Sequence, residues 1–253
     1  MEREPYEAIA SIYDFIMRHV NYRRWAGYLE ALWTRSGLER PEICELACGT
    51  GNIALELWRR GERVLLGCDI SEAMLKVARE KAEVVGAEVD FVRADLRDLS
   101  PLGKFDVLLC VYDSINYLRE DEVPEALLQA YEHLRPGGAF IFDICTEANS
   151  LKYFRDYTEV DFGPGFSYER RSRYDPEERI QYTYFEVHFS EDPEAYCEKH
   201  IQWIYPVEWV LERIRESPFK LLGAFPDFTF RRTEEERGDR VHFVLRKELT
   251  IVK

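Results

Sequence analysis

Short apolar runs alternate with longer amphipathic segments along the middle of the chain, from residue 41 to about residue 145. The runs have the length of buried strands, and the intervening segments carry apolar residues at helical spacing. The expected strands cover residues 43–46, 64–69, 89–92, 105–112 and 139–144, and the expected helices cover residues 52–60, 71–85 and 123–134. Strands that alternate with helices in this way are joined by right-handed crossovers into a parallel sheet. The pattern predicts a doubly wound α/β core with helices on both faces.

Different patterns flank this core. Residues 6–33 carry apolar side chains at helical spacing and predict two N-terminal cap helices. Beyond residue 146 the apolar positions alternate with a period of two, which predicts an inserted set of antiparallel strands. A helix and two strands follow and are expected to complete a seven-stranded sheet as an antiparallel hairpin. The expected organisation is cap helices at 1–40, an α/β core at 41–146, an antiparallel β insertion at 147–205 and the C-terminal completion of the core at 206–253.

The charge balance narrows the classes of partner. The 253 residues are 46% hydrophobic and carry a formal net charge of −14, with no long run of Lys and Arg. Such a surface repels phosphate backbones, so we expect no nucleic acid partner, although a local patch on an acidic protein could still bind a tRNA. No segment approaches the roughly 20 consecutive apolar residues of a membrane helix, and the N-terminal residues lack the apolar run of a signal peptide. We therefore expect a cytoplasmic protein without membrane contact.

Six cysteines are spread along the chain without forming a CxxC pair or a His-spaced cluster. Zinc sites require such spacings, so no metal site is expected. Most of the cysteines lie in or beside the apolar runs, which predicts reduced, buried thiols.

A loop with two glycines, E-L-A-C-G-T-G, follows the first expected strand and covers residues 45–51. In open α/β sheets the loops at the carboxyl ends of the strands bind ligands. Gly49 and Gly51 lack a Cβ atom, so the backbone can turn sharply and a ligand can lie against it. Residues 49–54 also fit the G-x-G-x-x-A pattern of dinucleotide-binding enzymes, so the glycines alone leave the cofactor open.

Two carboxylates bear on the choice of cofactor. Asp69 ends the second expected strand and suits a ribose diol. NAD contains such a diol, and so do nucleoside cofactors without a pyrophosphate, so Asp69 does not distinguish between them. Glu45 lies just before the turn, where its charge would oppose the pyrophosphate of NAD. A ligand that bears an ammonium group and no phosphate is more compatible with Glu45.

Four ordered segments within residues 41–145 resemble the motif set of the class I S-adenosylmethionine-dependent methyltransferases. They are E-L-A-C-G-T-G, G-C-D-I-S-E-A-M-L, R-A-D-L-R-D-L and L-R-P-G-G-A-F-I-F-D. The resemblance implies a Rossmann-like core, S-adenosylmethionine as the cofactor and S-adenosylhomocysteine as its product. It implies cofactor contacts by Tyr13, Glu45, Ala47, Gly49, Gly51, Asp69, Ile70, Met74, Asp95, Leu96 and Tyr112.

The resemblance also implies roles for the parts of this set. Gly49 and Gly51 would lie against the methionine part of the cofactor, and Asp69 would bind the ribose hydroxyls. Met74 or Ile70 would pack near the adenine, and Asp95 with Leu96 would meet its amino edge. Residues 12–14, I-Y-D, are similar to a Tyr-Asp pair of many small-molecule methyltransferases, in which the tyrosine approaches the sulfonium.

The segment after the fourth expected strand is the candidate acceptor site. Methyl transfer from a sulfonium is a direct displacement, so the protein mainly aligns the reactants and excludes water. An amine acceptor must also lose a proton, which a nearby polar group would assist. We expect Asp113, Asn116 and Tyr117 to face the acceptor; the alternative is that they satisfy local backbone groups in turns.

The nature of the acceptor is less defined by the sequence. Residues 113–118, together with the β insertion, resemble uncharacterised bacterial and archaeal members, amino-sugar N-methyltransferases and glycine-type N-methyltransferases. The segment lacks the prolines of the loop that holds planar amide or nucleobase nitrogens in other methyltransferases. We therefore expect a small-molecule acceptor, most simply an amine. The alternatives are a protein or tRNA acceptor, a cofactor-binding regulatory module and, last, an NAD(P)-dependent oxidoreductase; oligomerisation is not predicted either way.

The alternating segment 179–189 offers a candidate lid for the acceptor. It places Tyr182, Tyr184, Glu186 and His188 on one face, and His200 alternates with apolar neighbours in a later strand. We hypothesise that this face covers the acceptor pocket. The alternative is a solvent-exposed sheet face with ordinary cross-strand pairs.

Overall fold

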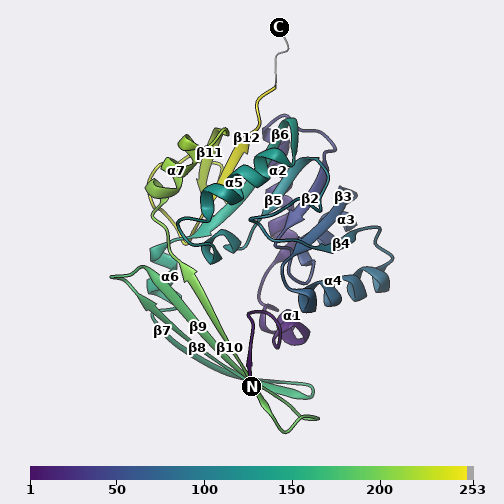
Figure 1. Ribbon diagram of the computed structural model, residues 1–253, viewed down its shortest axis with the longest axis vertical. Coiled ribbons are helices and arrows are strands. Elements are labelled where there is room, and N and C mark those ends of the chain that lie inside the picture. Colours follow the sequence, from purple (N-terminus) through teal and green to yellow (C-terminus); the bar gives the residue numbers. More distant parts are fainter. Residues whose placement is uncertain (250–253) are drawn as a thin grey trace.

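Two β-sheets organise the computed structural model, which describes residues 1–249 (Figure 1). The strands of the larger sheet are β2 (Glu42–Leu46), β3 (Arg63–Asp69), β4 (Asp90–Arg93), β5 (Phe105–Cys110), β6 (Leu134–Cys145), β11 (Lys220–Pro226) and β12 (Arg240–Arg246). Their order is β11-β12-β6-β5-β2-β3-β4, with the pairs β11·β12 and β12·β6 antiparallel and the others parallel. This seven-stranded sheet, closed by a C-terminal hairpin, confirms the predicted α/β architecture.

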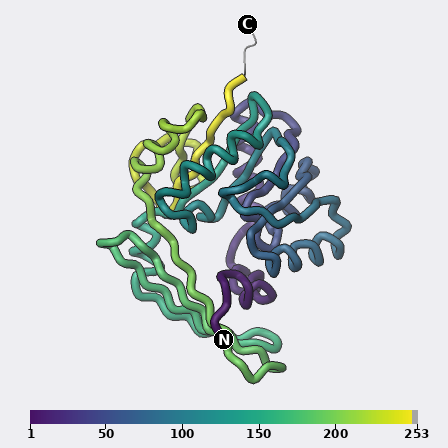
Figure 2. Tube along the Cα trace, viewed as in Figure 1, coloured from purple at the N-terminus to yellow at the C-terminus, as the bar shows by residue number. Residues whose placement is uncertain are grey.

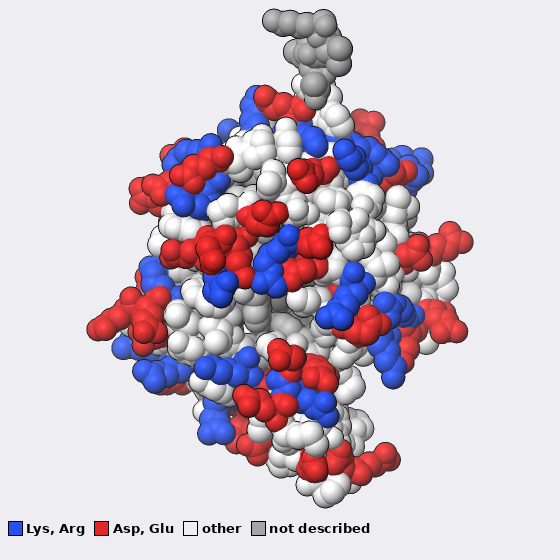
Figure 3. Space-filling model, viewed as in Figure 1, with Lys and Arg blue, Asp and Glu red and all other residues white. Residues whose placement is uncertain are grey.

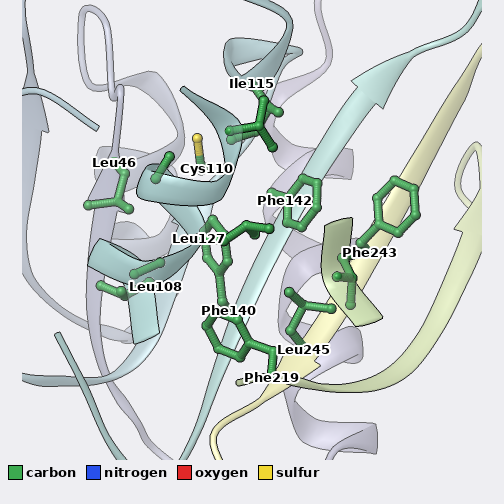
Figure 4. Packing of buried hydrophobic residues seen from close by; sticks show 14 of the residues in the cluster. Leu46, Leu108, Cys110, Ile115, Leu127, Phe140, Phe142, Phe219, Phe243 and Leu245 are labelled. Carbon is green, nitrogen blue, oxygen red and sulfur yellow. The ribbon is translucent and has the colours of Figure 1, made fainter. Parts of the chain in front are cut away.

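Helices cover both faces of the seven-stranded sheet. The buried side chains of α2 (Tyr22–Arg35), α3 (Asn52–Arg59) and α4 (Glu72–Val85) form one core cluster with Ile43, Val107 and Leu109. Those of α5 (Val123–Glu132) and α7 (Val207–Glu216) form another with alternate strand residues such as Phe142 and Phe243 (Figure 4), whose rings stack with centroids 5.0 Å apart. Burying each such large apolar side chain contributes about 1.5–3 kcal/mol. The sheet is therefore packed between two apolar layers, and the loops that follow the parallel strands lie at its carboxyl edge.

The smaller sheet combines the antiparallel strands predicted for the insertion with an N-terminal strand that was not predicted. It contains β1 (Glu2–Arg3), β7 (Asp156–Gly163), β8 (Phe166–Asp175), β9 (Ile180–Phe189) and β10 (Ala195–Trp203) in the order β1-β10-β9-β8-β7. A short helix, α6 (Glu147–Tyr153), precedes β7. Strands β7 to β10 are antiparallel, whereas β1 pairs parallel to β10 and brings the first residues of the chain to the edge of the insertion (Figure 2).

The lid hypothesis assigned the wrong face of β9. Tyr184 is 43% exposed and His188 is also exposed, so these side chains, with Tyr182 and Glu186, lie on the outer face. The buried face carries a mixture of polar and apolar side chains: Ser172, Gln181, Thr183, Phe185, Val187, Glu198, His200 and Gln202. His200 therefore lies on the buried face of the sheet, opposite to the exposed Tyr184 and His188.

The N-terminal cap is less helical than its spacing predicts. Only η1 (Ala10–Ile12) and α1 (Tyr13–Ile16) are helical before α2, which begins after Asn21, whose side chain accepts a hydrogen bond from the Arg24 N–H at 2.9 Å. The backbone N–H groups of residues 6, 8 and 9 instead donate to the carboxylate of Glu198. Within residues 1–249, no helix is both long and apolar enough to cross a membrane.

Candidate active site

A cavity of about 800 Å³ lies where β2 to β5 end and the loops of the seven-stranded sheet meet the N-terminal segment. It is lined by every residue predicted to contact the cofactor except Gly51: Tyr13, Glu45, Ala47, Gly49, Asp69, Ile70, Met74, Asp95, Leu96 and Tyr112. Tyr6, Tyr22 and Tyr117 also line it. The fold thus brings side chains from four strand ends and the N-terminal cap around one space.

The two glycines of the first loop serve different purposes. Gly49 has a φ of 54°, and a Cβ added there would meet nothing within 4 Å, so open space lies beside its backbone. Gly51 also has a positive φ, of 75°, but a Cβ there would lie 2.9 Å from the Phe91 ring. Gly51 is therefore required for packing between α3 and β4 and does not reach the cavity. Left-handed backbone and close packing both favour glycine.

Asp69 fixes the shape of this loop. Its Oδ2 accepts the Gly49 N–H at 2.8 Å, and its Oδ1 accepts the Ser71 N–H at 2.9 Å. Burial raises the pKa of the carboxyl, and these N–H donors oppose that rise. Asp69 lines the cavity beside Ile70 and Met74.

Glu45 is a buried acid on the same wall. It is 3% exposed, and its Oε2 accepts the Ala54 N–H at 2.8 Å, inside the first turn of α3. Burial raises the pKa of Glu45 to about 8, because the charged form loses hydration. A cationic group in the cavity would favour the ionised carboxylate.

Asp95 lies at a third strand end and is already paired. Its oxygens accept hydrogen bonds from Arg97 Nε at 2.8 Å and Arg97 Nη2 at 2.5 Å, and Arg97 also contacts Glu122 at 2.5 Å. Hydrogen bonds from Arg97 lower the pKa of Asp95. This pairing positions Asp95 and the neighbouring Leu96 on the cavity wall.

Comparison with known proteins identifies the family. Residues 43–138 match the family described as a methyltransferase domain. YqeM of Bacillus subtilis strain 168, which is named as a methyltransferase, is 32% identical over 251 residues, covering 98% of this chain and 99% of YqeM. The chain belongs to the class I S-adenosylmethionine-dependent methyltransferases.

Solved structures share the fold of this methyltransferase. An S-adenosylmethionine-dependent methyltransferase from Clostridium acetobutylicum ATCC 824 matches with a TM-score of 0.81 at 22% identity, over 96% of this chain and 99% of that one. CalS10, an amino pentose methyltransferase from Micromonospora echinaspora solved with bound S-adenosylmethionine, matches with a TM-score of 0.70 at 17% identity, over 93% and 96% of the two chains. Because both matches cover nearly the full length of this chain, they include the inserted sheet as well as the core.

Of the three residues that we expect to face the acceptor, the structure places only one at the cavity. Tyr117 lines the cavity, whereas Asp113 and Asn116 do not. Asp113 accepts hydrogen bonds from Arg240 and Gln202, each at 2.6 Å, on the far side of its loop. Asn116 is fully buried; its Nδ2 donates to the Trp203 carbonyl at 2.7 Å and its Oδ1 accepts the Cys145 N–H at 3.0 Å. The geometry corrects the expectation for both residues, which join the loop to β6 and β10.

Asp14 has a contact that the Tyr-Asp resemblance did not predict. It accepts hydrogen bonds from Thr50 Oγ1 at 2.7 Å, Asn52 Nδ2 at 2.8 Å and Lys81 Nζ at 2.6 Å, and so ties α1 to the glycine loop. Burial alone would raise the pKa of Asp14, but the donors, led by Lys81, together lower it. Tyr13 is held over the loop as a consequence.

Replacing Asp14 by alanine is expected to weaken binding of S-adenosylhomocysteine about tenfold, because α1 loses its anchor to the loop. One hydrogen bond to a charged group contributes about 1.5–3 kcal/mol, and Asp14 is partly exposed, so the lower end applies. Isothermal titration calorimetry measures the change. Glu80→Ala, an exposed acid on α4, is the matched control; equal affinities in the two variants would contradict the anchoring role.

Proposed function

We propose that this methyltransferase transfers the methyl group of S-adenosylmethionine to a small-molecule amine by direct displacement. The observation that carries the proposal is a single cavity whose wall combines cofactor-type residues from the strand ends with a cluster of tyrosines, in which Tyr6 packs against Tyr13 and Tyr117. Its volume of about 800 Å³ falls within the range of about 300–1,000 Å³ typical of small-ligand pockets. The N-terminal segment and its residues Tyr6 and Tyr13 form part of the wall.

The cavity residues at the strand ends fit S-adenosylmethionine. Asp69 offers carboxylate oxygens for the ribose hydroxyls, and Ile70 and Met74 offer apolar contact for the adenine. The open space beside Gly49 allows close approach of the backbone, and Glu45 favours the ammonium group of the methionine part. When bound, the cofactor supplies an electrophilic methyl group on a sulfonium. The chain's part is to align the acceptor with that group and to exclude water.

An amine acceptor suits the charge of the cavity. Besides Glu45, whose raised pKa leaves it largely neutral until a cation binds, carboxylates outnumber basic side chains in its wall: Glu4, Glu7, Asp69, Glu72, Asp95 and Glu122 against Arg93 and Arg97. Clefts lined by one sign of charge concentrate ligands of the opposite sign. The likeness to CalS10, an amino pentose methyltransferase, supports the same class of acceptor.

Macromolecular acceptors receive less support. The net charge is −14, and Lys and Arg are interspersed with Asp and Glu over the face shown in Figure 3. Binding to a nucleic acid backbone draws its affinity from clustered positive charge. A small acceptor that fits inside the cavity needs no such surface.

The test is methyl transfer from tritiated S-adenosylmethionine to a panel of amines: D-glucosamine, ethanolamine, putrescine and glycine. We expect label in at least one amine, with turnover that saturates as the amine concentration rises. Parallel reactions contain a protein extract and bulk tRNA. Label confined to protein or tRNA, or binding of S-adenosylhomocysteine without transfer to any of these probes, would overturn the proposal.

A further inference from the structure

Two buried polar side chains of the inserted sheet contact Tyr6 and Tyr117, which line the cavity. Glu198 and His200 lie on the inward face of β10, and each is 2% exposed. The Glu198 carboxylate accepts N–H groups of Tyr6 at 2.8 Å and Ile9 at 3.0 Å, and also that of Ala8. Its Oε2 also lies 3.0 Å from His200 Nε2. Burial of an acid and an imidazole is costly unless both are hydrogen-bonded, and here both are.

The hydrogen bonds form a chain with one direction. A carboxylate only accepts, so His200 Nε2 carries the proton and donates to Glu198. In a neutral imidazole Nδ1 is then the acceptor, and it lies 3.1 Å from the Tyr117 hydroxyl, which donates to it. The Tyr117 oxygen in turn accepts from the Tyr6 hydroxyl at 2.5 Å. Tyr6 and Tyr117 both line the cavity, so the chain of hydrogen bonds leads from buried Glu198 to the cavity wall.

We propose that His200 is the proton acceptor for the amine, reached through Tyr6 and Tyr117 and held in its tautomer by Glu198. This inference rests on the proposed function. Glu198 and His200 act through other groups, so both are positioning residues for the phenol that meets the acceptor. The nearby outer pair Glu186 and His188 has the same spacing but lies away from the cavity.

The proton transfer balances without a further reactant. The N–H bond of the protonated amine breaks and its proton joins the Tyr6 oxygen, while the Tyr6 proton moves to Tyr117 and the Tyr117 proton moves to His200 Nδ1. The nitrogen keeps the electron pair, which is then available to form the bond to the methyl carbon. His200 becomes an imidazolium beside the Glu198 carboxylate and returns its proton to water after product release.

The surroundings of His200 suit this role. The titratable groups that face it are Glu198 on the same strand, Tyr117 on η2 (Ser114–Tyr117) and Tyr6 on the N-terminal segment; Phe185 of β9 covers its ring with centroids 5.3 Å apart. Burial raises the pKa of both tyrosines well above the usual value, so they pass protons while staying neutral. The Glu198 carboxylate accepts the Nε2 hydrogen of His200 whether or not Nδ1 is protonated.

The first experiment needs no acceptor. In protein labelled with ¹⁵N-histidine and saturated with S-adenosylhomocysteine, we expect His200 to show a protonated Nε2 and an unprotonated Nδ1 at pH 8. The Nδ1 resonance should shift in Tyr117→Phe, which removes the hydrogen-bond donor. A neutral His200 with its proton on Nδ1 would overturn the proposed proton relay, which runs from the amine through Tyr6 and Tyr117 to His200, whatever the acceptor proves to be.

The second experiment uses the amine of the panel that is methylated. His200→Gln keeps polar contacts but cannot take up a proton, so we expect kcat/KM at pH 7 to fall about 10²–10⁴-fold, with little change in the KM for S-adenosylmethionine. The loss should shrink as pH rises and the free amine becomes abundant. Tyr6→Phe should lose activity in the same direction, and His188→Gln should stay within twofold of the wild type.

The outcomes separate the relay from the proposed function. A His200→Gln variant with the wild-type pH profile and kcat would show that the chain only holds the N-terminal segment in place. Wild-type protein that methylates none of the four amines would contradict the proposed function. The tautomer of His200 would then still decide whether the relay exists.

Discussion

Replacement of Asp69 by alanine is expected to weaken binding of S-adenosylhomocysteine about 10²–10³-fold. The variant loses a buried carboxylate whose oxygens would meet the ribose, and hydrogen bonds to charged groups contribute about 1.5–3 kcal/mol each. It also releases the N–H groups of Gly49 and Ser71, which now donate to Asp69 at 2.8 and 2.9 Å. Isothermal titration calorimetry measures the affinity, and circular dichroism verifies that the variant is folded.

Two further variants make the Asp69 result specific. Asp69→Glu keeps the charge and both acceptor oxygens, so we expect most of the affinity to return. Asp90→Ala removes an exposed acid from the neighbouring strand and should bind as the wild type does. An Asp69→Ala variant with undiminished affinity would refute the assigned ribose contact.

The core and the cavity wall at the strand ends are predictable because their signals are local. Gly49 follows the first strand within a few residues, and Asp69 is the last residue of the next. Once parallel strands lie side by side, their carboxyl ends meet at one edge. The sequence therefore places these side chains together without knowledge of any long-range contact.

The part of the cavity wall formed by Tyr6 and Tyr117 depends on contacts between distant parts of the chain. Glu198 accepts the N–H of Tyr6 across 192 positions, and β1 pairs with β10 over a similar separation. The Glu198 carboxylate accepts backbone N–H groups that would otherwise form hydrogen bonds within a helix. The apolar spacing of residues 6–16 does not indicate this contact. The spacing therefore predicts a longer first helix than the η1 and α1 turns that form.

The face of β9 was mispredicted for a physical reason. Alternation defines two faces but does not say which is buried when both carry polar residues. Gln181 and Thr183 are buried because they have partners: Gln181 contacts Ser150 and Gln202 at 2.9 Å, and Thr183 lies 3.0 Å from Ser172. Side-chain partners from other strands are not visible in the pattern of one strand.

The boundary between α5 and β6 shows a similar limit. The sequence pattern predicts a helix to residue 134 and a strand from residue 139, with Pro136, Gly137 and Gly138 as a local turn signal between them, but α5 ends at Glu132 and β6 already begins at Leu134. Leu134 pairs with Phe105 of β5, and the strand passes through the glycines with a shift in register. Pairing with a neighbouring strand overrides the local turn signal.

The largest loss of stability is expected when Arg240 is replaced by methionine. Arg240 contacts Asp113 at 2.6 Å and pairs with Asp143, which is fully buried and also accepts the N–H groups of Tyr112 and Asp113. Removing one partner of a buried ion pair leaves uncompensated charge, which costs about 3–5 kcal/mol. For a chain of this length that corresponds to a fall in Tm of about 6–20 °C. Differential scanning calorimetry measures it.

The pH dependence of this loss identifies its cause. Burial raises the pKa of Asp113, and in the native protein Arg240 opposes that rise. Without the guanidinium, the folded state gains stability by protonating Asp113, so the deficit should be greatest at pH 8 and should shrink toward pH 5. Arg231→Met removes an exposed arginine nearby and should leave the Tm unchanged. A deficit in Arg240→Met that does not vary with pH would mean that lost packing against Trp25 and Tyr112, whose ring centroids lie 5.3 and 4.9 Å from the guanidinium, outweighs the charge.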